Sequence, residues 1–428
     1  MRKKLLAGML ALALCSTNMP LQTIFAEEFT SGNSDVVSEE ETPEIFTNEE
    51  QETAGETDGE LSVFSSEEVP EFNDTPDEAM AAAENEQAEE IVDLADNDKV
   101  TKGVYTIKSA GNHKFICSRE TGNRIVVDGE NILAKDEINI YLNNVSINTI
   151  AGSALQIKGN VKAAVTIHLT GTNSLITKNN WYAGLQKDNK AQLIIKTNNS
   201  DATAGILNAR SIDGDGAGIG GGYHGSGSCS NIFIDSCSVI ASSKYGAGIG
   251  GSKQRAGSDI TINSSSVTAS STNGDGIGGG YEYGGSCKNI TINGGSVKAS
   301  SVSGSPTNEG KEVYCCTIEN PENANVTIKT GTGSSVNWKP VNHSSLDPDD
   351  TNLYVWLPKL ESNSTNSYLI ILDPENSSES RTRNYSFDTV TNTFKAAQVV
   401  NDFIFKSPVN LTYDGQPKEA SLEFKFKP

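Results

Sequence analysis

The sequence predicts an all-β protein built as a parallel β-helix, a solenoid in which each turn of chain stacks on the turn before it. The first observation is repetition. Three blocks between Gly216 and Val297 recur at a period of about 29 residues, and each carries Gly-Ile-Gly-Gly, with its Ile at 219, 249 or 277. The second is that apolar residues alternate in short runs between Gly, Ser and Asn clusters, without helical spacing. This period is typical of solenoids, because one repeat cannot bury its apolar face alone.

Each block supplies three strands of three or four residues, which together make one turn. In the second block they are Ala-Gly-Ile-Gly-Gly, Ile-Thr-Ile and Val-Thr-Ala-Ser. Ile and Val would stack on their counterparts at roughly 4.8 Å per turn, and Gly suits corners that need positive φ or close backbone contact. Weaker echoes at 138–147 and 165–176 extend the pattern toward the N-terminus. We expect about seven turns between Val104 and Ile328, within a domain at 98–335.

The first residues of the chain predict export. Basic residues at 2–4 precede an apolar run at 5–14, and small residues before Glu27 offer a cleavage site. Residues 1–26 therefore have the pattern of a signal peptide. No later apolar run is long enough to span a bilayer, so we expect a secreted or surface protein without a transmembrane segment in the mature chain.

The net charge of −22 comes from the segment that follows. Residues 27–97 hold 25 Asp and Glu and no Lys or Arg, which leaves the remaining domains close to neutral. A segment so acidic and poor in aromatic residues cannot bury enough apolar surface to offset its ordering entropy, so it is predicted to be a disordered leader. The neutral remainder has no basic patch, which argues against a nucleic-acid partner.

The glycine-rich pattern stops near residue 335. Segments at 352–360, 367–373 and 383–397 alternate like antiparallel strands, and we expect a β-rich capping module at 336–400 over the open end of the solenoid. Residues 401–428 contain two strands and a turn, which is marginal as an independent unit. We expect this last module to be incomplete.

Six cysteines follow the signal peptide, and their spacing predicts one disulfide. Cys315 lies 28 residues after Cys287, and each precedes an Ile by three positions. If both occupy the same position on successive turns, they are within reach of a disulfide. The alternative is a stack of reduced cysteines that fills the core.

The loop after each Gly-Ile-Gly-Gly strand carries the candidate binding residues. Aligned at an offset of 58, the first and third blocks place Tyr223 over Tyr281, with Lys253 between them. Aromatic rings beside charged groups suit carbohydrate, because a ring packs on the flat face of a sugar. The candidate binding residues are Tyr223, His224, Lys253, Arg255, Tyr281, Glu282 and Tyr283. The alternative is that these tyrosines cover the solenoid surface and contact no ligand.

Two motifs resemble known families. Gly-Ala-Gly-Ile-Gly-Gly-Gly at 216–222 and Ile-Thr-Ile-Asn-Gly-Gly-Ser-Val-Lys-Ala-Ser at 290–300 are similar to the glycine-rich β-helix carbohydrate-binding domain of clostridial and other Gram-positive surface proteins. This resemblance implies a right-handed parallel β-helix, polysaccharide binding and bound calcium, without strong lyase activity. No calcium ligand can be matched residue by residue. The ending at 410–420, Asn-Leu-Thr-Tyr-Asp-Gly-Gln-Pro-Lys-Glu-Ala, resembles the start of a YDG-type, mucin-binding-like adhesin module.

Three functions remain open from the sequence. The favoured one is an adhesin-like protein on a Gram-positive surface that binds extended polysaccharide without cleaving it. A β-helix polysaccharide lyase or glycosidase would need carboxylates and a basic residue on one face; Lys253, Arg255 and Glu282 are the only neighbouring candidates, so we expect no enzyme. The third is a structural stalk, whose binding function would lie elsewhere.

Overall fold

The computed structural model describes residues 90–198, 205–223, 229–282, 287–320, 324–331, 333–336, 338, 350–359, 367–373 and 380–397 with side chains, and 400–406 and 421–426 as backbone. The predicted signal peptide and most of the predicted leader lie outside these residues. Among the described residues, none forms a helix with the length and apolarity needed to cross a bilayer.

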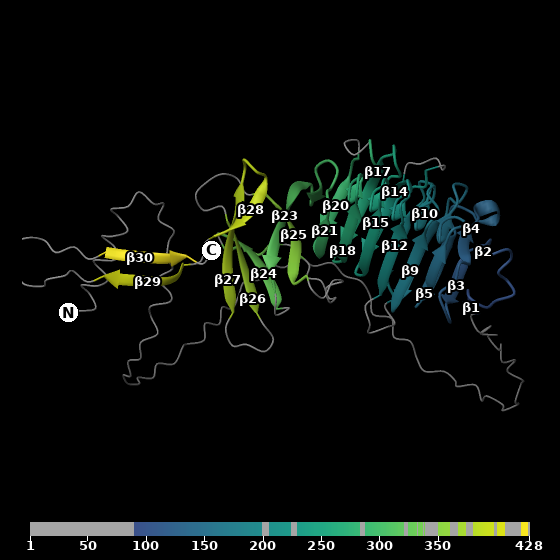
Figure 1. Ribbon diagram of the computed structural model, residues 1–428, viewed down its shortest axis with the longest axis horizontal. Helices are drawn as coiled ribbons and strands as arrows, with labels where there is room; N and C mark the ends of the chain where they lie inside the picture. Colours follow the sequence, from purple (N-terminus) through teal and green to yellow (C-terminus); the bar gives the residue numbers. More distant parts are fainter. Residues whose placement is uncertain are drawn as a thin grey trace, which may run out of the picture. The chain divides into compact units, whose positions relative to one another are not determined.

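The chain from residue 91 to residue 308 forms a parallel β-solenoid of about six turns, with three sheets along its length (Figure 1). Sheet A is the largest, and its nine parallel strands are β1 (Ile91–Asp93), β3 (Gly111–Ile116), β5 (Glu137–Asn143), β8 (Ala164–Thr170), β11 (Leu193–Thr197), β14 (Cys229–Asp235), β17 (Gly257–Asn263), β20 (Ile290–Asn293) and β22 (Thr307–Asn308). A short 3-10 helix, η2 (Gly129–Asn131), precedes β5.

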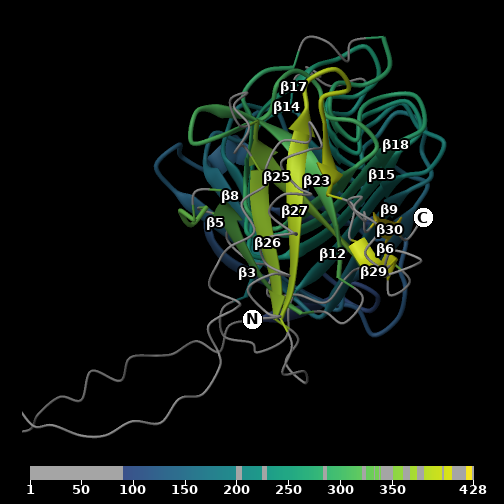
Figure 2. The same ribbon diagram turned by 90° about the vertical axis from the view of Figure 1, so that its left-hand side faces the viewer.

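Two further parallel sheets close each turn. Sheet B contains β2 (Val104–Ile107), β4 (Arg124–Val127), β7 (Leu155–Ile157), β10 (Leu185–Lys187), β13 (Ile219–Gly220), β16 (Ile249–Gly250) and β19 (Ile277–Gly278). Sheet C contains β6 (Ser146–Thr149), β9 (Thr172–Thr177), β12 (Ile206–Ser211), β15 (Ser238–Ser243), β18 (Ser266–Ser271) and β21 (Ser296–Ala299). In Figure 2, strands of sheet A and sheet C are labelled on opposite sides of the core.

The strand register stacks like residues into buried ladders. Ile219, Ile249 and Ile277 pair in order across sheet B, as the sequence period predicts, and all three are fully buried. Side chains alternate inward and outward along each strand, so every turn adds one layer to the same core. An apolar side chain in one layer therefore contacts its counterparts in the layers on either side, and no single turn has a core of its own.

Glycine in the repeated motif is required by the spacing of the turns. Gly250 has a φ of +135°, and a Cβ placed on it would lie 2.1 Å from the carbonyl oxygen of Gly278 on the next turn. Side chains rarely adopt such a φ, and a contact that short is not tolerated. The stacked Gly-Ile-Gly strands therefore bring two backbones together where no other residue fits.

The parallel solenoid ends earlier than the sequence predicts, which accounts for six turns instead of seven. β23 (Lys311–Glu319) runs antiparallel to β22, and β25 (Asn352–Pro358) runs antiparallel to β23. A four-stranded antiparallel sheet follows, made of β24 (Asn325–Thr330), β26 (Ser367–Asp373), β27 (Arg381–Asp388) and β28 (Thr393–Ala396). β29 (Val400–Lys406) and β30 (Ser421–Phe426) form an antiparallel pair.

Contacts join the antiparallel strands to the last turn of the solenoid. Trp356 on β25 donates its indole N–H to the Val297 carbonyl at 2.9 Å, and Trp338 donates to Gly295 at 3.2 Å. Lys298 forms an ion pair with Asp350. β25 thus packs on the edge of the last turn, although the antiparallel part starts at 311 and not at the predicted 336. At the other end, β1 begins at 91, inside the segment predicted to be leader.

The predicted bridge between Cys287 and Cys315 does not form, because the two residues are not stacked. Both carry free thiols. Cys315 lies on β23, where it pairs with Trp356. Around Cys287 the structure instead places Gly257, whose N–H donates to the sulfur at 3.3 Å, and Gly304 on the following segment.

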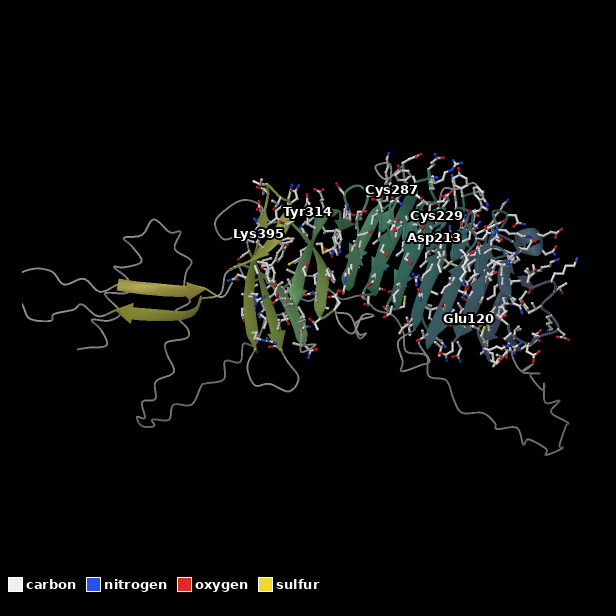
Figure 3. The ribbon with its side chains drawn as sticks, viewed as in Figure 1. Glu120, Asp213, Cys229, Cys287, Tyr314 and Lys395 are labelled. Carbon is white, nitrogen blue, oxygen red and sulfur yellow. The ribbon has the colours of Figure 1, made fainter. Side chains whose placement is uncertain are left out.

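In place of that bridge, the core of the structure contains reduced cysteines. Cys229 and Cys287, both labelled in Figure 3, are buried, and Gly257, which pairs with Cys229, separates them. Burial raises the pKa of the Cys229 thiol to about 12. This cysteine therefore packs as a small apolar side chain.

Candidate functional site

The candidate site is built from the two loops that flank each strand of sheet B. Two rows of residues run along the solenoid. The first row lies four residues before the stacked Leu185, Ile219 and Ile249, and the second row lies four residues after Ile219, Ile249 and Ile277. The first row contains Trp181, Asp215 and Tyr245, and the second contains Tyr223, Lys253 and Tyr281. We call these six residues the corner ridge.

One backbone hydrogen bond, repeated three times, sets the spacing of the ridge. Tyr223 N–H donates to the Trp181 carbonyl at 2.8 Å, and Tyr281 N–H donates to the Tyr245 carbonyl at 2.8 Å. Between them, Lys253 N–H donates to the Asp215 carbonyl at 2.7 Å. Each bond joins the first row on one turn to the second row on the next turn. The ridge is therefore an ordered sequence of an aromatic pair, a charged pair and an aromatic pair.

The two aromatic pairs leave ring surface open to solvent. The Trp181 and Tyr223 ring centroids lie 5.3 Å apart with an interplanar angle of 34°, and those of Tyr245 and Tyr281 lie 6.2 Å apart at 60°. Trp181 is 43% exposed and Tyr281 is 41% exposed. Two turns separate the pairs, which corresponds to roughly 10 Å along the solenoid. An elongated ligand can therefore contact both pairs at once.

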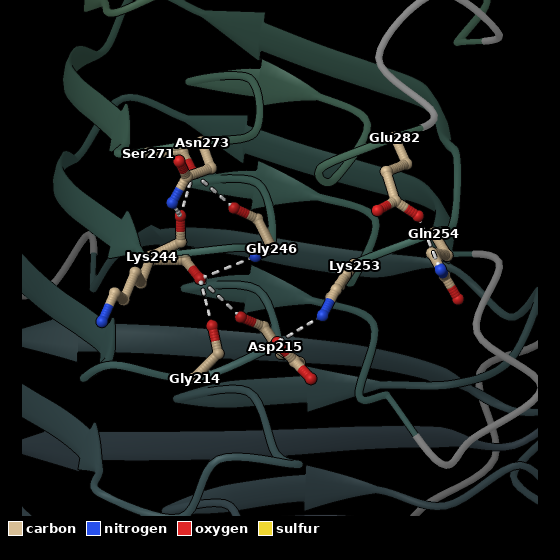
Figure 4. Close-up of polar contacts among 11 residues, drawn as sticks. Gly214, Asp215, Lys244, Gly246, Lys253, Gln254, Ser271, Asn273 and Glu282 are labelled. Carbon is tan, nitrogen blue, oxygen red and sulfur yellow. Dashed lines mark hydrogen bonds and ion pairs between the residues drawn. The ribbon is translucent and has the colours of Figure 1, made fainter.

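The charged pair holds Tyr245 in place. Lys253 Nζ lies 3.7 Å from an Asp215 carboxylate oxygen and 5.1 Å from the centre of the Tyr245 ring. Lys244 Nζ lies 5.4 Å from the same ring and pairs with Asp213 at 3.3 Å. Two ammonium groups near one ring favour its present orientation through cation–π attraction. Figure 4 shows Lys253 and Asp215 side by side.

The other residues predicted from the sequence lie beside the ridge or outside the described residues. Glu282 accepts a hydrogen bond of 2.6 Å from the Gln254 amide (Figure 4). The Arg255 side chain is exposed, and its carbonyl accepts from Gly280 N–H. His224 and Tyr283 lie outside the described residues. Lys253 therefore pairs with Asp215, and Glu282 with Gln254.

Half of the ridge is not predicted by the alignment of the repeated blocks. Trp181, Asp215 and Tyr245 precede the sheet B strands, whereas only the loops that follow those strands were compared. A signal for them exists: each lies two residues before an Ala-Gly pair, at 183–184, 217–218 or 247–248. Aligning both sides of the repeated motif would have found the first row.

A shallow polar groove of about 390 Å³ adjoins the ridge. It follows the ends of three sheet C strands, and its lining includes Arg210, Lys244, Asp213 and a series of hydroxyl side chains at 211, 242, 243, 270, 271 and 272. Hydroxyls and a guanidinium can hydrogen-bond a ligand that extends sideways from the ridge. Lys244 connects the groove to the ridge, since it lines the groove and its Nζ lies 5.4 Å from the centre of the Tyr245 ring.

A third aromatic pair, on the outer face of sheet A, is less suited to sugar stacking. The Tyr141 and His168 rings lie 4.3 Å apart and nearly parallel, at 10°. Their facing surfaces cover each other, and Lys114 lies 5.6 Å from the centre of the Tyr141 ring. Less ring face remains for a sugar than on the corner ridge.

The described residues were compared with the ligand set that the predicted calcium would need. Among them, no group of three or more His, Cys, Asp or Glu side chains could hold a metal ion. Calcium prefers six to eight oxygen ligands, several of them carboxylates.

Comparison with known proteins supports the fold. A family model described as a beta helix repeat matches residues 260–281 and 290–305. The matched residues cover β17–β19 and β20–β21, the last regular turns of the solenoid. No curated protein and no solved structure matches this chain.

Proposed function

We propose that this protein binds an extended polysaccharide along the corner ridge and does not cleave it. The observation that carries the proposal is the alternation of aromatic, charged and aromatic pairs on successive turns, joined by one repeated hydrogen bond. Two aromatic pairs roughly 10 Å apart offer stacking surfaces to separate sugars of one chain, and the charged pair between them offers hydrogen bonds to hydroxyls.

The site is formed before a ligand arrives, which favours binding. Each ridge residue sits on a backbone fixed by the solenoid, so a ligand orders few additional groups. A rigid row on a repeating scaffold also suits a repeating polymer better than a compact small molecule. We further propose a secreted, cell-surface location of the adhesin type on a Gram-positive bacterium, following the predicted signal peptide and the family resemblance.

Affinity electrophoresis of the whole secreted chain tests this proposal. Native gels would contain one polysaccharide each, from neutral and acidic plant and host classes, with calcium and with a chelator. We expect migration to be retarded by at least one class, with no new reducing ends or unsaturated products after long incubation. Depolymerisation would favour the lyase or glycosidase alternative. Unretarded migration in every gel would favour a stalk.

The gels with calcium and with chelator test a separate prediction, that the protein binds calcium, which follows from the family resemblance. If calcium organises the bound state, the chelator abolishes retardation and added calcium restores it. If the ridge binds by itself, retardation is the same in both gels. The two results distinguish a ridge that binds by itself from one that needs calcium.

A further inference from the structure

An open pocket of about 530 Å³ lies on the outer face of sheet A, away from the corner ridge. Its floor is formed where β14, β17 and β20 end, by Asp235, Asn263 and Asn293, which pair with one another in order across the sheet. These three residues are half-buried. The pocket volume lies within the range of small-molecule sites, about 300–1,000 Å³.

A β-hairpin forms the far wall of the pocket. β22 pairs in parallel with β20 through Thr291 and Thr307, and then turns back into β23. The turn consists of Glu309 and Gly310, with φ values of +49° and +75°. Positive φ at both central residues is the geometry of a type I′ turn, which fixes a hairpin tightly. Glu309 is thus placed by a rigid connection at the rim of the pocket.

The lining chemistry selects a class of ligand. None of the eight lining residues is Lys or Arg, while Asp235 and Glu309 are acidic, so an anionic ligand would be repelled. The Asn293 amide N–H donates to the Asn263 amide oxygen at 2.9 Å. That bond joins the two amides into a pair that carries both N–H donors and oxygen acceptors on the floor of the pocket. Donors and acceptors side by side match hydroxyl groups, which both donate and accept.

We infer that this pocket binds a single neutral sugar unit, through paired hydrogen bonds to adjacent hydroxyls from Asp235, Asn263, Asn293 and Glu309. The site is separate from the ridge and does not depend on the function proposed for it. A molecule with both sites would hold a polymer along one corner and a sugar residue on another face, so it could bridge two glycans.

Saturation-transfer difference NMR on the whole chain tests the inference. The probes are glucose, galactose, mannose and fucose, each measured separately, with glucuronic acid as the acidic comparison. We expect signal from at least one neutral sugar and none from glucuronic acid. Asp235→Ala and Glu309→Ala should each lower the affinity for that sugar by about tenfold, since a hydrogen bond to a charged group is lost.

Two variants separate this site from the ridge and from misfolding. Tyr245→Ala with Tyr281→Ala should leave the sugar signal unchanged, while Glu309→Ala, on an exposed turn, should retain the circular dichroism and thermal transition of the parent chain. The inference is overturned if no neutral sugar gives signal, or if the ridge variant removes that signal while the folded pocket variants keep it. Unchanged polymer binding in the ridge variant, with a retained sugar signal, would refute the ridge proposal alone.

Discussion

At the scale of single residues, Lys253 links the parts of the ridge. Its backbone N–H donates to the Asp215 carbonyl. Its ammonium group forms an ion pair with the Asp215 carboxylate and lies beside the Tyr245 ring. We predict that Lys253→Met changes the free energy of unfolding by less than about 1 kcal/mol, because its ion pair is long, at 3.7 Å, and both side chains remain partly exposed to water. Polysaccharide binding should nevertheless weaken by about fivefold, since Tyr245 loses a cation that orients it.

The control for this change is Lys395→Met, which removes an ion pair with Asp388 on the C-terminal sheet. This change should leave polysaccharide affinity as it is in the parent chain, and its effect on the free energy of unfolding should be as small as that of Lys253→Met. Affinity electrophoresis and denaturant titration measure the two effects. Equal weakening of binding in both variants would show that the loss reflects net charge and not the position of Lys253.

Asp128 provides a prediction about pH. Its carboxylate accepts hydrogen bonds from the side chains of Asn160 at 2.8 Å and Lys158 at 2.7 Å, which lower its pKa from 3.8 to about 2. Because the folded pKa is the lower one, the carboxylate stabilises the fold above pH 3.8, and this contribution is lost as the pH falls toward 2. We expect Asp128→Asn to reduce the loss of unfolding free energy over that interval.

Urea titrations at a series of pH values check this prediction. Lys158→Met should reduce the same pH dependence in part, because it removes one of the two side-chain partners and leaves Asn160 and the Glu130 N–H. An unchanged slope in Asp128→Asn would mean that other carboxylates account for the acid sensitivity of the fold.

At the scale of elements, the stacked glycines of sheet B limit what the repeat tolerates. Gly250→Ala would place a methyl group 2.1 Å from the Gly278 carbonyl oxygen at a φ of +135°. We predict a loss of at least about 3 kcal/mol in unfolding free energy, from backbone strain and from separation of the turns. Gly122→Ala is the matched control, because its nearest atom would be 3.8 Å away. Equal stability of the two variants in denaturant titration would contradict this account.

The sequence predicted the elements of the solenoid well but not its end. Repetition of Ile219, Ile249 and Ile277 fixed the register, because a shift of even one residue would turn the apolar face outward. The prediction fails at β23, because its alternating apolar residues fit a parallel or an antiparallel strand equally well. The spacing from Cys287 to Cys315 therefore suggested one more turn, where the chain instead reverses through Glu309 and Gly310.

The candidate site was predicted only in part, for a related reason. Tyr223, Lys253 and Tyr281 follow the repeated motif and could be aligned from the sequence. Trp181 and Tyr245 belong to preceding loops, and their contacts cross from one turn to the next. Such pairing depends on which loops of successive turns approach each other, and the repeat period alone does not give that.

At the scale of the whole molecule, the antiparallel strands protect the last solenoid turn. Trp356 reaches from β25 to the Val297 carbonyl and packs against the main core. We predict that Trp356→Ala lowers the unfolding free energy by about 3–5 kcal/mol, as large aromatic truncations do, and increases hydrogen exchange in β20 and β21 before β5 and β8. Val390→Ala, at a position that is 90% exposed, is the control. Uniform exchange along the solenoid would indicate that the edge needs no such protection.

The measurement that tests the central claim most directly is the dissociation constant for the retarding polysaccharide in ridge variants of the whole chain. Trp181→Ala with Tyr223→Ala removes one aromatic pair, and Tyr245→Ala with Tyr281→Ala removes the other. Each double variant should bind at least about tenfold more weakly than the parent, while Tyr141→Ala, outside the ridge, binds as the parent does. Unchanged affinity in both folded double variants would contradict the proposal that the corner ridge is the polysaccharide site.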